Sequence, residues 1–287
     1  MIFYKYASPL DFNTFSEIPP VHSITYNSQL FMLFYTPNIA DNQELPAEEA
    51  VHALRVLRLK NGDKVQLIDG KGGFYEAKLV LEGKKCLLNI VSEKKDDKRS
   101  DVYVHLAIAP TKNIDRIEFM LEKCVEIGID EISFLNCRYS ERKNIKLERL
   151  EKVAIQAMKQ SLKTFLPKIN EMIDFDKFLS RQNTENQLFI AHLEATERKL
   201  FSKEVYHFFK DFTENKSENQ QNNQQNQLPN ASFCMLIGAE GDFSVQEIEN
   251  AKKKNYLPVS LGESRLRTET AGIFVCQTIE IIKQLFE

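Results

Sequence analysis

The second part of the chain alternates between short apolar runs and segments with helical spacing. The apolar runs predict strands at Val102–Ala109, Glu131–Leu135, Leu188–His192, Phe233–Ile237 and Leu257–Leu261. Apolar residues recur every three or four positions in three further segments, which predict helices over Ile114–Val125, Leu147–Met158 and Thr268–Phe286. Strands separated by helices predict an α/β domain with a mostly parallel sheet that is covered on both faces.

Residues 32–97 show a different pattern, rich in short alternating runs. We expect strands at Met32–Tyr35, Lys64–Asp69, Phe74–Leu81 and Lys85–Val91, with one helix over Pro46–Leu57. The charged run Glu93–Ser100 separates this β-rich unit from the α/β part. The sequence therefore predicts two domains, at residues 32–97 and 101–287.

Two further segments fit neither pattern. Residues 1–31 are rich in turn formers and show little periodicity, which predicts a disordered N-terminal extension. Asparagine and glutamine dominate Asn215–Asn230, which cannot bury enough apolar surface to offset its ordering entropy. We therefore expect a disordered insertion over residues 213–230.

The composition of the 287 residues, 43% hydrophobic and 28% charged, is that of an ordinary globular protein. Neither a membrane-spanning run nor a signal peptide is visible, so we expect a cytoplasmic protein without a membrane partner. The five cysteines form no CxxC pair and show no metal-ligand spacing, which predicts neither disulfides nor a bound metal. His105 lies within a predicted strand and is expected to be a hydrogen-bonded core residue.

A glycine-rich loop follows the strand predicted at Phe233–Ile237. It reads Gly238-Ala239-Glu240-Gly241-Asp242-Phe243-Ser244, and Ser244 has capping-box spacing with Glu247 for a following helix. Open α/β sheets bind ligands at the carboxyl ends of their strands, and glycine lets a ligand approach the backbone closely. The loop lacks the lysine of a P-loop, and by itself it is equally consistent with a tight turn that has no function.

A second loop of this kind follows the strand predicted at Leu257–Leu261. It reads Gly262-Glu263-Ser264-Arg265-Leu266-Arg267 and leads into the last helix, for which Thr268 suits the N-cap. The helix start does not explain two arginines in such a tight loop. Because successive β–α units place their loops at one edge of a sheet, we expect the two loops to meet over one crevice.

Together these loops resemble those of the RsmE family, SPOUT-superfamily methyltransferases that methylate N3 of a uridine in 16S ribosomal RNA. The resemblance rests on Gly238-x-Glu240-Gly241-x-Phe243-Ser244, on Leu261-Gly262-x-x-Arg265-Leu266-Arg267-Thr268-Glu269-Thr270-Ala271, and on a lysine-led helix from Lys112. The segment His52–Val65 is similar to the N-terminal PUA-like barrel of the family. The resemblance begins at Met32, which implies an incorrectly chosen start codon as the alternative explanation of residues 1–31. The resemblance implies a SPOUT α/β domain with a trefoil knot, a small PUA-like β-barrel that binds RNA, a homodimer, and S-adenosylmethionine as cofactor.

The resemblance also assigns site residues by position. It implies a cofactor site lined by Leu236, Gly238, Glu240, Gly241, Leu261, Gly262, Leu266, Arg267, Thr268 and Ala271. Two positions depart from the family. Its members usually have proline where this chain has Ala239, and they often have arginine where it has Lys163.

The implied reaction is direct methyl transfer to uridine N3, whose proton must be removed or whose developing anion must be stabilised. We expect Arg138, Arg142 and Arg267 to hold RNA or to stabilise that charge, with Glu269 as the candidate proton acceptor. Two alternatives stay open. One is a SPOUT enzyme that methylates ribose 2′-hydroxyls, and the other is a non-catalytic RNA-binding protein that retains the fold.

A net charge of −3 argues against an RNA partner. This value is an average over the whole chain, however, and two segments are strongly basic. Residues 140–170 carry eight cations against three carboxylates, and residues 52–64 carry four against one. These basic faces predict contacts with the phosphates of 16S rRNA in the small ribosomal subunit, although a solvated helix face with i,i+4 ion pairs also explains part of the charge. The candidate RNA contacts are Arg55, Arg58, Lys112, Arg142, Lys143 and Lys163.

Overall fold

The computed structural model describes residues 33–83, 85–95, 101–181, 184–194, 197–219 and 231–286. The chain divides into two units, Met1–Met32 and Leu33–Glu287, and every element named below belongs to the second. The predicted N-terminal extension lies outside the described residues. So does the part of the predicted insertion that follows Asn219.

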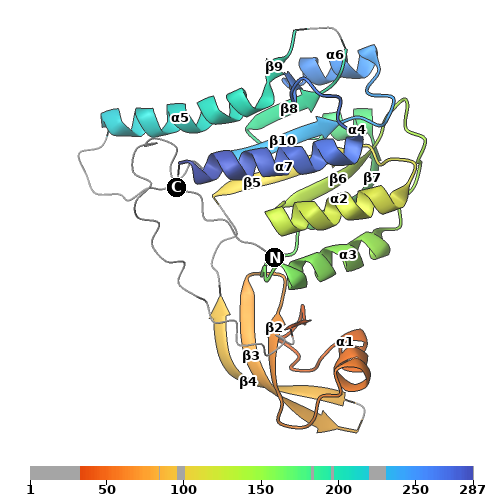
Figure 1. The fold of residues 1–287 in the computed structure, drawn as a ribbon, viewed down its shortest axis with the longest axis vertical. Helices are drawn as coiled ribbons and strands as arrows, with labels where there is room; N and C mark the ends of the chain where they lie inside the picture. Colours follow the sequence, from red (N-terminus) through yellow and green to blue (C-terminus); the bar gives the residue numbers. More distant parts are fainter. Residues whose placement is uncertain are drawn as a thin grey trace, which may run out of the picture. The chain divides into compact units, whose positions relative to one another are not determined.

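The first part of this unit is a four-stranded sheet in the order β1-β2-β3-β4 (Figure 1). Its strands are β1 (Leu33–Tyr35), β2 (Lys64–Ile68), β3 (Gly73–Glu82) and β4 (Lys85–Lys95). The pairs β2–β3 and β3–β4 are antiparallel, and β1 runs parallel to β2. Leu67, Leu79 and Cys86 are fully buried, as the alternation along these strands predicts.

The helix predicted over Pro46–Leu57 is wrong in its second half. α1 covers only Ala47–Val51, and a π-helical turn (η1) follows over His52–Val56. The amide of Leu57 donates to the carbonyl of His52 at 3.0 Å, which is the i→i+5 bond of a π-helix. Over five residues the spacing of apolar positions cannot distinguish this wider turn from an α-helical one.

The second part is a seven-stranded, entirely parallel sheet in the order β7-β6-β5-β10-β8-β11-β9. The strands are β5 (Val102–Ile108), β6 (Glu131–Asn136), β7 (Lys168–Asp174), β8 (Gln187–Ala191), β9 (Lys199–Leu200), β10 (Ala231–Ile237) and β11 (Leu257–Ser260). The predicted α/β class is therefore confirmed.

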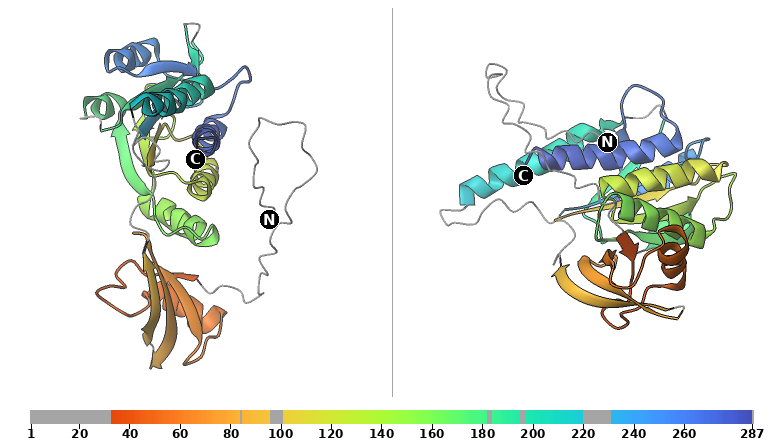
Figure 2. Two further views of the ribbon diagram at one scale, coloured as in Figure 1. Left: turned by 90° about the vertical axis from the view of Figure 1, so that its left-hand side faces the viewer. Right: turned by 60° about the horizontal axis from the view of Figure 1, so that its bottom comes forward.

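Helices cover both faces of this sheet, as Figure 2 shows in its left view. One face carries α2 (Ile114–Ile127), α3 (Leu147–Gln160), α5 (Phe201–Asn219) and α7 (Thr268–Gln284). The other carries α4 (Phe175–Ser180) and α6 (Val245–Lys253). Each face buries its own hydrophobic cluster, which is why the strands are continuous apolar runs. Within the described residues, no helix is both long and apolar enough to cross a lipid bilayer.

Four elements were not predicted, namely β7, α4, β9 and α5. β7 is only half-buried, so it shows no clean alternation. α5 buries Phe201, Val205 and Phe209 at four-residue spacing, a signal that is present in the sequence. Because α5 continues to Asn219, the start of the predicted disordered insertion is helical instead. A polar tract can extend a helix whose first turns are anchored in the core.

The β-rich part packs directly against α3. Leu33 and Ile68 belong to the same buried cluster as Leu150 and Ala154 of α3. The turn after β2 also bonds to the segment after α3, because the amide of Leu166 donates to the carbonyl of Gly70 at 2.9 Å. The two predicted domains are therefore in direct contact, through β1, the end of β2 and α3.

All three cations within α3 are held in ion pairs within the chain, which weakens the predicted basic RNA face. Lys159 Nζ lies 2.6 Å from Glu49 Oε1, and Lys152 Nζ lies 2.8 Å from Glu48 Oε1, so both lysines bind α1. Arg149 pairs with Glu118 and Asp115 of α2. The cations of α3 therefore act mainly in ion pairs that hold α1 and α2 against this helix.

The Lys159–Glu49 pair is expected to stabilise the packing of α1 on α3. Both side chains are largely buried, and Glu49 also accepts from the amide of Tyr35 at 3.0 Å. A double-mutant cycle with Lys159→Met and Glu49→Gln should give a coupling energy of about 1–3 kcal/mol in urea unfolding. The exposed pair Lys152–Glu48 is the matched control and should show no measurable coupling. Equal coupling in the two pairs would contradict the assignment.

Candidate functional site

A cavity of about 360 Å³ opens at the carboxyl ends of β8, β10 and β11. Both loops that the sequence singled out contribute to its wall, as predicted. β8 lies between β10 and β11 in the sheet, so the end of β8 forms a third wall between the loops.

The loop after β10 is a tight turn that requires glycine at its start. A Cβ at Gly238 would lie 2.9 Å from the backbone carbon of Asp242, which no side chain tolerates. The turn closes by a hydrogen bond from the amide of Asp242 to the carbonyl of Ala239 at 2.9 Å. Ser244 and Glu247 form the predicted capping box at the start of α6. The loop is therefore rigid at both ends.

The loop after β11 has fewer internal contacts. Gly262 has a φ of 127°, and Ser260 Oγ donates to its carbonyl at 2.9 Å. The N-cap of α7 is Arg267 and not Thr268, which is the first helical residue. Arg265 and Arg267 have no ion-pair partner among the described residues, and both line the cavity.

Hydrogen bonds tie the glycine-rich loop and the start of α6 to the loops after β5 and β6. Glu240 Oε1 accepts from the amide of Lys112 at 3.1 Å, and Glu247 Oε1 accepts from the amide of Arg138 at 2.8 Å. Arg142 donates to the carbonyls of Thr111 and Lys112. These contacts join the loops after β5, β6 and β10 into one structure.

Eight of the ten predicted cofactor-site residues line the cavity. They are Gly238, Glu240, Leu261, Gly262, Leu266, Arg267, Thr268 and Ala271. Leu236 does not line it, because its side chain is fully buried in the hydrophobic cluster with α4 and α6. Gly241 is also outside the wall and packs instead on Tyr139, where a Cβ would lie 3.0 Å from the Tyr139 Cβ.

The predicted catalytic residues separate into two groups. Arg267 and Glu269 line the cavity, whereas Arg138 and Arg142 lie in the loop after β6. Glu269 is buried, and its Oε1 lies 3.7 Å from Arg116 Nε. Its Oε2 has no hydrogen-bond partner in the described part of the chain. A buried carboxylate oxygen without a partner is available to a ligand.

The predicted RNA contacts do not share one surface. Lys112 and Lys143 extend from the loops after β5 and β6, where Lys112 pairs with Glu141 at 2.9 Å and Lys143 donates to Asn136. Arg55 and Arg58 are exposed on the β-rich part. Lys163 lies near the other end of the sheet, where its Nζ donates to the carbonyl of Ile127 at 3.4 Å.

Sequence reasoning missed the wall that the end of β8 provides. Ala191, His192 and Leu193 line the cavity, together with Arg198 just before β9. His192 is the last residue of the strand predicted at Leu188–His192, and its place at a carboxyl strand end was the available signal. Its place between the two loops depends on the strand order of the sheet, which the sequence pattern does not give.

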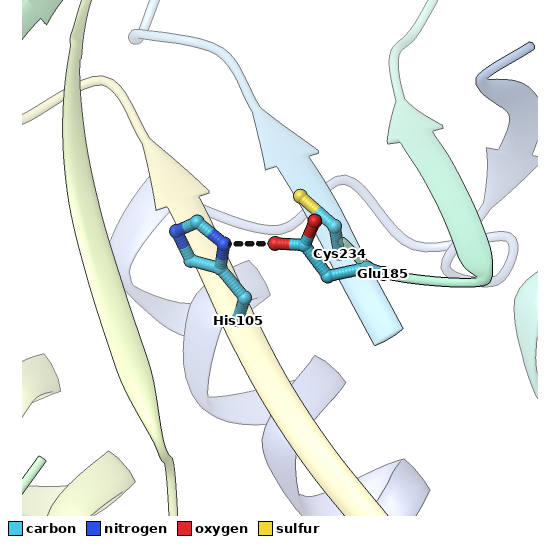
Figure 3. A group of neighbouring side chains, drawn as sticks. All are labelled: His105, Glu185 and Cys234. Atoms are coloured by element: carbon cyan, nitrogen blue, oxygen red, sulfur yellow. Dashed lines mark hydrogen bonds and ion pairs between the residues drawn. The ribbon is translucent and has the colours of Figure 1, made fainter. Parts of the chain in front are cut away.

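A second cluster of polar side chains lies in the core, on the face that α4 and α6 cover. His105, Glu185 and Cys234 bring one nitrogen, one oxygen and one sulfur within 4.8 Å of one another, the spacing of a metal site (Figure 3). Arg181 already supplies a cation there, since its Nη2 lies 2.7 Å from Glu185 Oε1 and 3.6 Å from Cys234 Sγ. Burial raises the pKa of the Cys234 thiol to about 12, so the thiol stays protonated. The donor set therefore fits an ion-pair network better than a metal.

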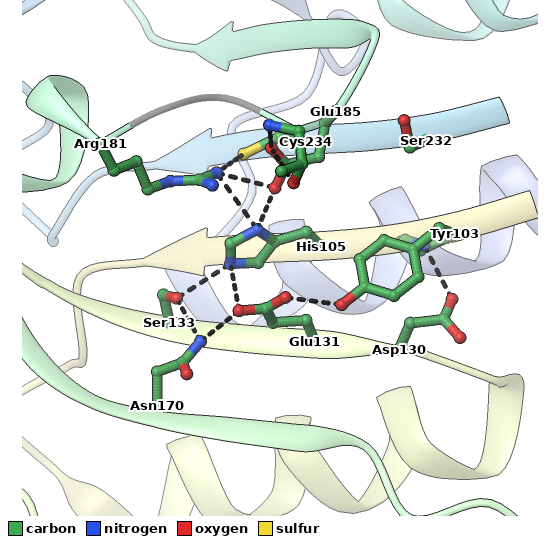
Figure 4. A network of polar contacts seen from close by, with 12 residues as sticks. Tyr103, His105, Asp130, Glu131, Ser133, Asn170, Arg181, Glu185, Ser232 and Cys234 are labelled. Atoms are coloured by element: carbon green, nitrogen blue, oxygen red, sulfur yellow. Dashed lines mark hydrogen bonds and ion pairs between the residues drawn. The ribbon is translucent and has the colours of Figure 1, made fainter.

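Figure 4 shows how far this network extends. His105 Nδ1 lies 2.5 Å from Glu185 Oε1, and its Nε2 lies 2.9 Å from Ser133 Oγ. Asn170 of β7 donates to Ser133 and to Glu131. The expectation that His105 is a hydrogen-bonded core residue is confirmed, and its network connects β5, β6, β7 and the segment before β8.

Comparison with known protein families gives two matches along the chain. A family model described as an RNA methyltransferase domain matches residues 98–280, and one described as an RNA methyltransferase PUA domain matches residues 45–91. The first match spans the seven-stranded sheet, and the second lies within the β-rich part.

Individual relatives agree with these models. The chain is 27% identical to the ribosomal RNA small subunit methyltransferase E of Rickettsia conorii over 87% of this chain and 95% of that protein. A structure described as a probable rRNA-methyltransferase from Porphyromonas gingivalis is 38% identical, with a TM-score of 0.74 over 90% of this chain and 100% of that one. Ribosomal RNA small subunit methyltransferase E from Neisseria gonorrhoeae, solved with S-adenosyl methionine, shares the fold at 24% identity and a TM-score of 0.69, over 88% of this chain and 98% of that one.

The His105 network predicts a specific pH dependence of stability. Burial acts to raise the pKa of Glu185, but the bonds from His105 and Arg181 outweigh it and hold the pKa far below the ordinary value of 4.5. The stabilisation is therefore complete above pH 4.5 and is lost as the pH falls below that value. Glu185→Gln should cost about 3–5 kcal/mol in urea unfolding at pH 7, and the difference from the unsubstituted protein should shrink from pH 4.5 downwards.

The exposed carboxylate Glu249, which pairs with Lys252 on α6, provides the control. Glu249→Gln should unfold at the same urea midpoint as the unsubstituted protein at pH 7. A difference between Glu185→Gln and the unsubstituted protein that stays constant down to pH 3 would contradict the ion-pair assignment.

Proposed function

The chain belongs to the RNA methyltransferase family, in the group of ribosomal RNA small subunit methyltransferases E, and from this premise we propose its reaction. We propose that it transfers a methyl group from S-adenosylmethionine to N3 of one uridine in the 16S rRNA of the small ribosomal subunit. The observation that carries the proposal is the cavity in which the two loops meet.

The groups in the cavity wall match the chemistry of S-adenosylmethionine. Gly238 and Gly262 bring backbone groups to the surface, and Leu261, Leu266 and Ala271 provide an apolar wall for a flat nucleobase. When bound, the cofactor supplies an electrophilic methyl group on a sulfonium centre. The rigid loop after β10 holds the cavity in shape without the ligand, so little ordering entropy is lost on binding.

The acceptor nitrogen carries a proton that must leave. Glu269 lies in the cavity wall, and one of its carboxylate oxygens has no partner among the described residues, so it is the residue we assign as proton acceptor. Arg267 is the cation we assign to stabilise negative charge on the uracil, because it lines the cavity and is exposed. Uridine N3 is on the Watson–Crick edge, so the base must be unstacked to enter the cavity.

The RNA backbone has candidate contacts on both parts of the chain. Lys112 and Lys143 lie in loops tied to the cavity, and Arg55 and Arg58 are exposed on the β-rich part that matches the PUA model. Lys163 is not retained in this proposal, because it lies near the opposite end of the sheet.

The proposed reaction predicts one new N3-methyluridine in 16S rRNA. Small subunits from a bacterial strain that lacks this modification would be incubated with the purified protein and S-adenosylmethionine. Primer extension should then stop at one uridine, because N3 methylation blocks Watson–Crick pairing. Resistance of one phosphodiester to alkali without a pairing block would instead indicate ribose 2′-hydroxyl methylation.

Two variants test the assigned roles. Arg267→Ala and Glu269→Gln should each lower the methylation rate by about 100-fold or more. Their urea midpoints should stay near that of the unsubstituted protein, which separates a loss of chemistry from a loss of fold. Lys254→Ala, at the exposed end of α6, is the control that should methylate normally. Normal turnover of Arg267→Ala would remove Arg267 from the site.

We further propose that the chain forms a homodimer through the outer surface of α2 and α7. These helices pack side by side (Figure 1), and each carries exposed large apolar side chains. Phe119 is 53% exposed, Phe274 38% and Ile281 48%, and Leu285 follows at the end of α7. Such a surface marks a protein–protein contact.

The homodimer predicts that a charge on this surface separates the subunits. Phe274→Asp should shift the mass measured by light scattering from that of two chains to that of one. Val245→Asp places the same charge on an exposed apolar residue of α6, on the other face of the sheet, and should leave the mass unchanged. A mass of one chain for the unsubstituted protein at micromolar concentration would contradict the proposal.

A further inference from the structure

His192 lines the cavity at the end of β8. It directly follows β8, the strand between β10 and β11, and its side chain is only 4% exposed. Neither loop motif contains it, and no role was predicted for it from the sequence.

The backbone around His192 is fixed on both sides. The amide of Leu193 donates to Asp242 Oδ2 at 2.7 Å, and the guanidinium of Arg198 donates to the carbonyl of His192. Asp242 makes its bond from a left-handed conformation with a φ of 66°, which is unfavourable for a residue with a side chain. His192 is therefore held in place by contacts that do not involve its own ring.

The imidazole ring itself has no hydrogen-bond partner among the described residues. Both Nδ1 and Nε2 are buried and unpaired within the part of the chain that the structure describes, which costs stability in a folded protein. Burial lowers the pKa of His192, and the positive charges of Arg198 and Lys252 lower it further. The negative charge of Asp242 acts in the opposite direction but is outweighed. At pH 7 the ring is neutral and offers one donor and one acceptor.

We propose that His192 is a ligand-binding residue of this cavity, which hydrogen-bonds to the nucleoside part of S-adenosylmethionine; the inference rests on the function proposed above. A neutral group with one donor and one acceptor matches the ribose hydroxyls and the adenine edge. The charged ends of the methionine part match the arginines and Glu240 of the wall instead. Because the ring nitrogens are covered, the contact requires the ring to turn into the cavity about its side-chain torsions while the fixed backbone stays in place.

Calorimetric titration with S-adenosylhomocysteine and with adenosine tests this assignment. His192→Leu should weaken the binding of both compounds by the same factor, about tenfold. His192→Gln, which keeps a donor and an acceptor, should recover part of that loss. His207→Leu, at an exposed histidine of α5, is the matched control and should bind both compounds as the unsubstituted protein does.

Stability without ligand distinguishes a binding role from a structural one. If the ring serves only the ligand, His192→Leu should raise or preserve the thermal unfolding midpoint, because an unpaired polar group is replaced by an apolar one. A lower midpoint, unchanged affinity, or a loss of affinity for S-adenosylhomocysteine but not for adenosine would each overturn the proposal. If the unsubstituted protein binds neither compound, the proposed function itself fails, which is a separate result.

Discussion

The burial of one parallel sheet on both of its faces is the constraint on which the rest of this structure depends. A parallel sheet needs helices on both sides, and each helix returns the chain so that the next strand ends at the same edge. The strand order places β8 between β10 and β11. The carboxyl ends of these three strands, with the loops that follow them, therefore surround one cavity. The two loop motifs come together only because the sheet has this strand order.

Electrostatics in this chain acts first on packing and only then on ligands. Lys159, Lys152 and Arg149 of α3 pair with acids of neighbouring helices, so a strongly basic segment holds α1 and α2 against α3. Arg265 and Arg267, in contrast, line the cavity without an ion-pair partner among the described residues. A charge count along the sequence cannot separate these two uses, because the acids that pair with α3 are distant in the chain.

The sequence predicts elements well where burial imposes a clear period, and it fails where position depends on tertiary order. Strands such as β5 and β10 are buried on both faces and stand out as apolar runs, whereas the half-buried β7 does not. Eight of the ten cofactor-site residues that the resemblance assigns line the cavity. The exceptions are Leu236, whose side chain turns into the core, and Gly241, which packs on Tyr139. The wall from β8 was missed because no local pattern states which strands are neighbours.

Two buried histidines illustrate the difference between a side chain that serves the fold and one that serves a ligand. His105 and His192 both follow or interrupt apolar strands, so their sequence contexts are alike. His105 has both ring nitrogens occupied, by Glu185 and Ser133, and its burial is thereby compensated. His192 is equally buried, its backbone is fixed by Asp242 and Arg198, and neither nitrogen has a partner in the described part of the chain. A fold that fixes a polar group so firmly and leaves it unpaired in a cavity wall has a position that a ligand can complete.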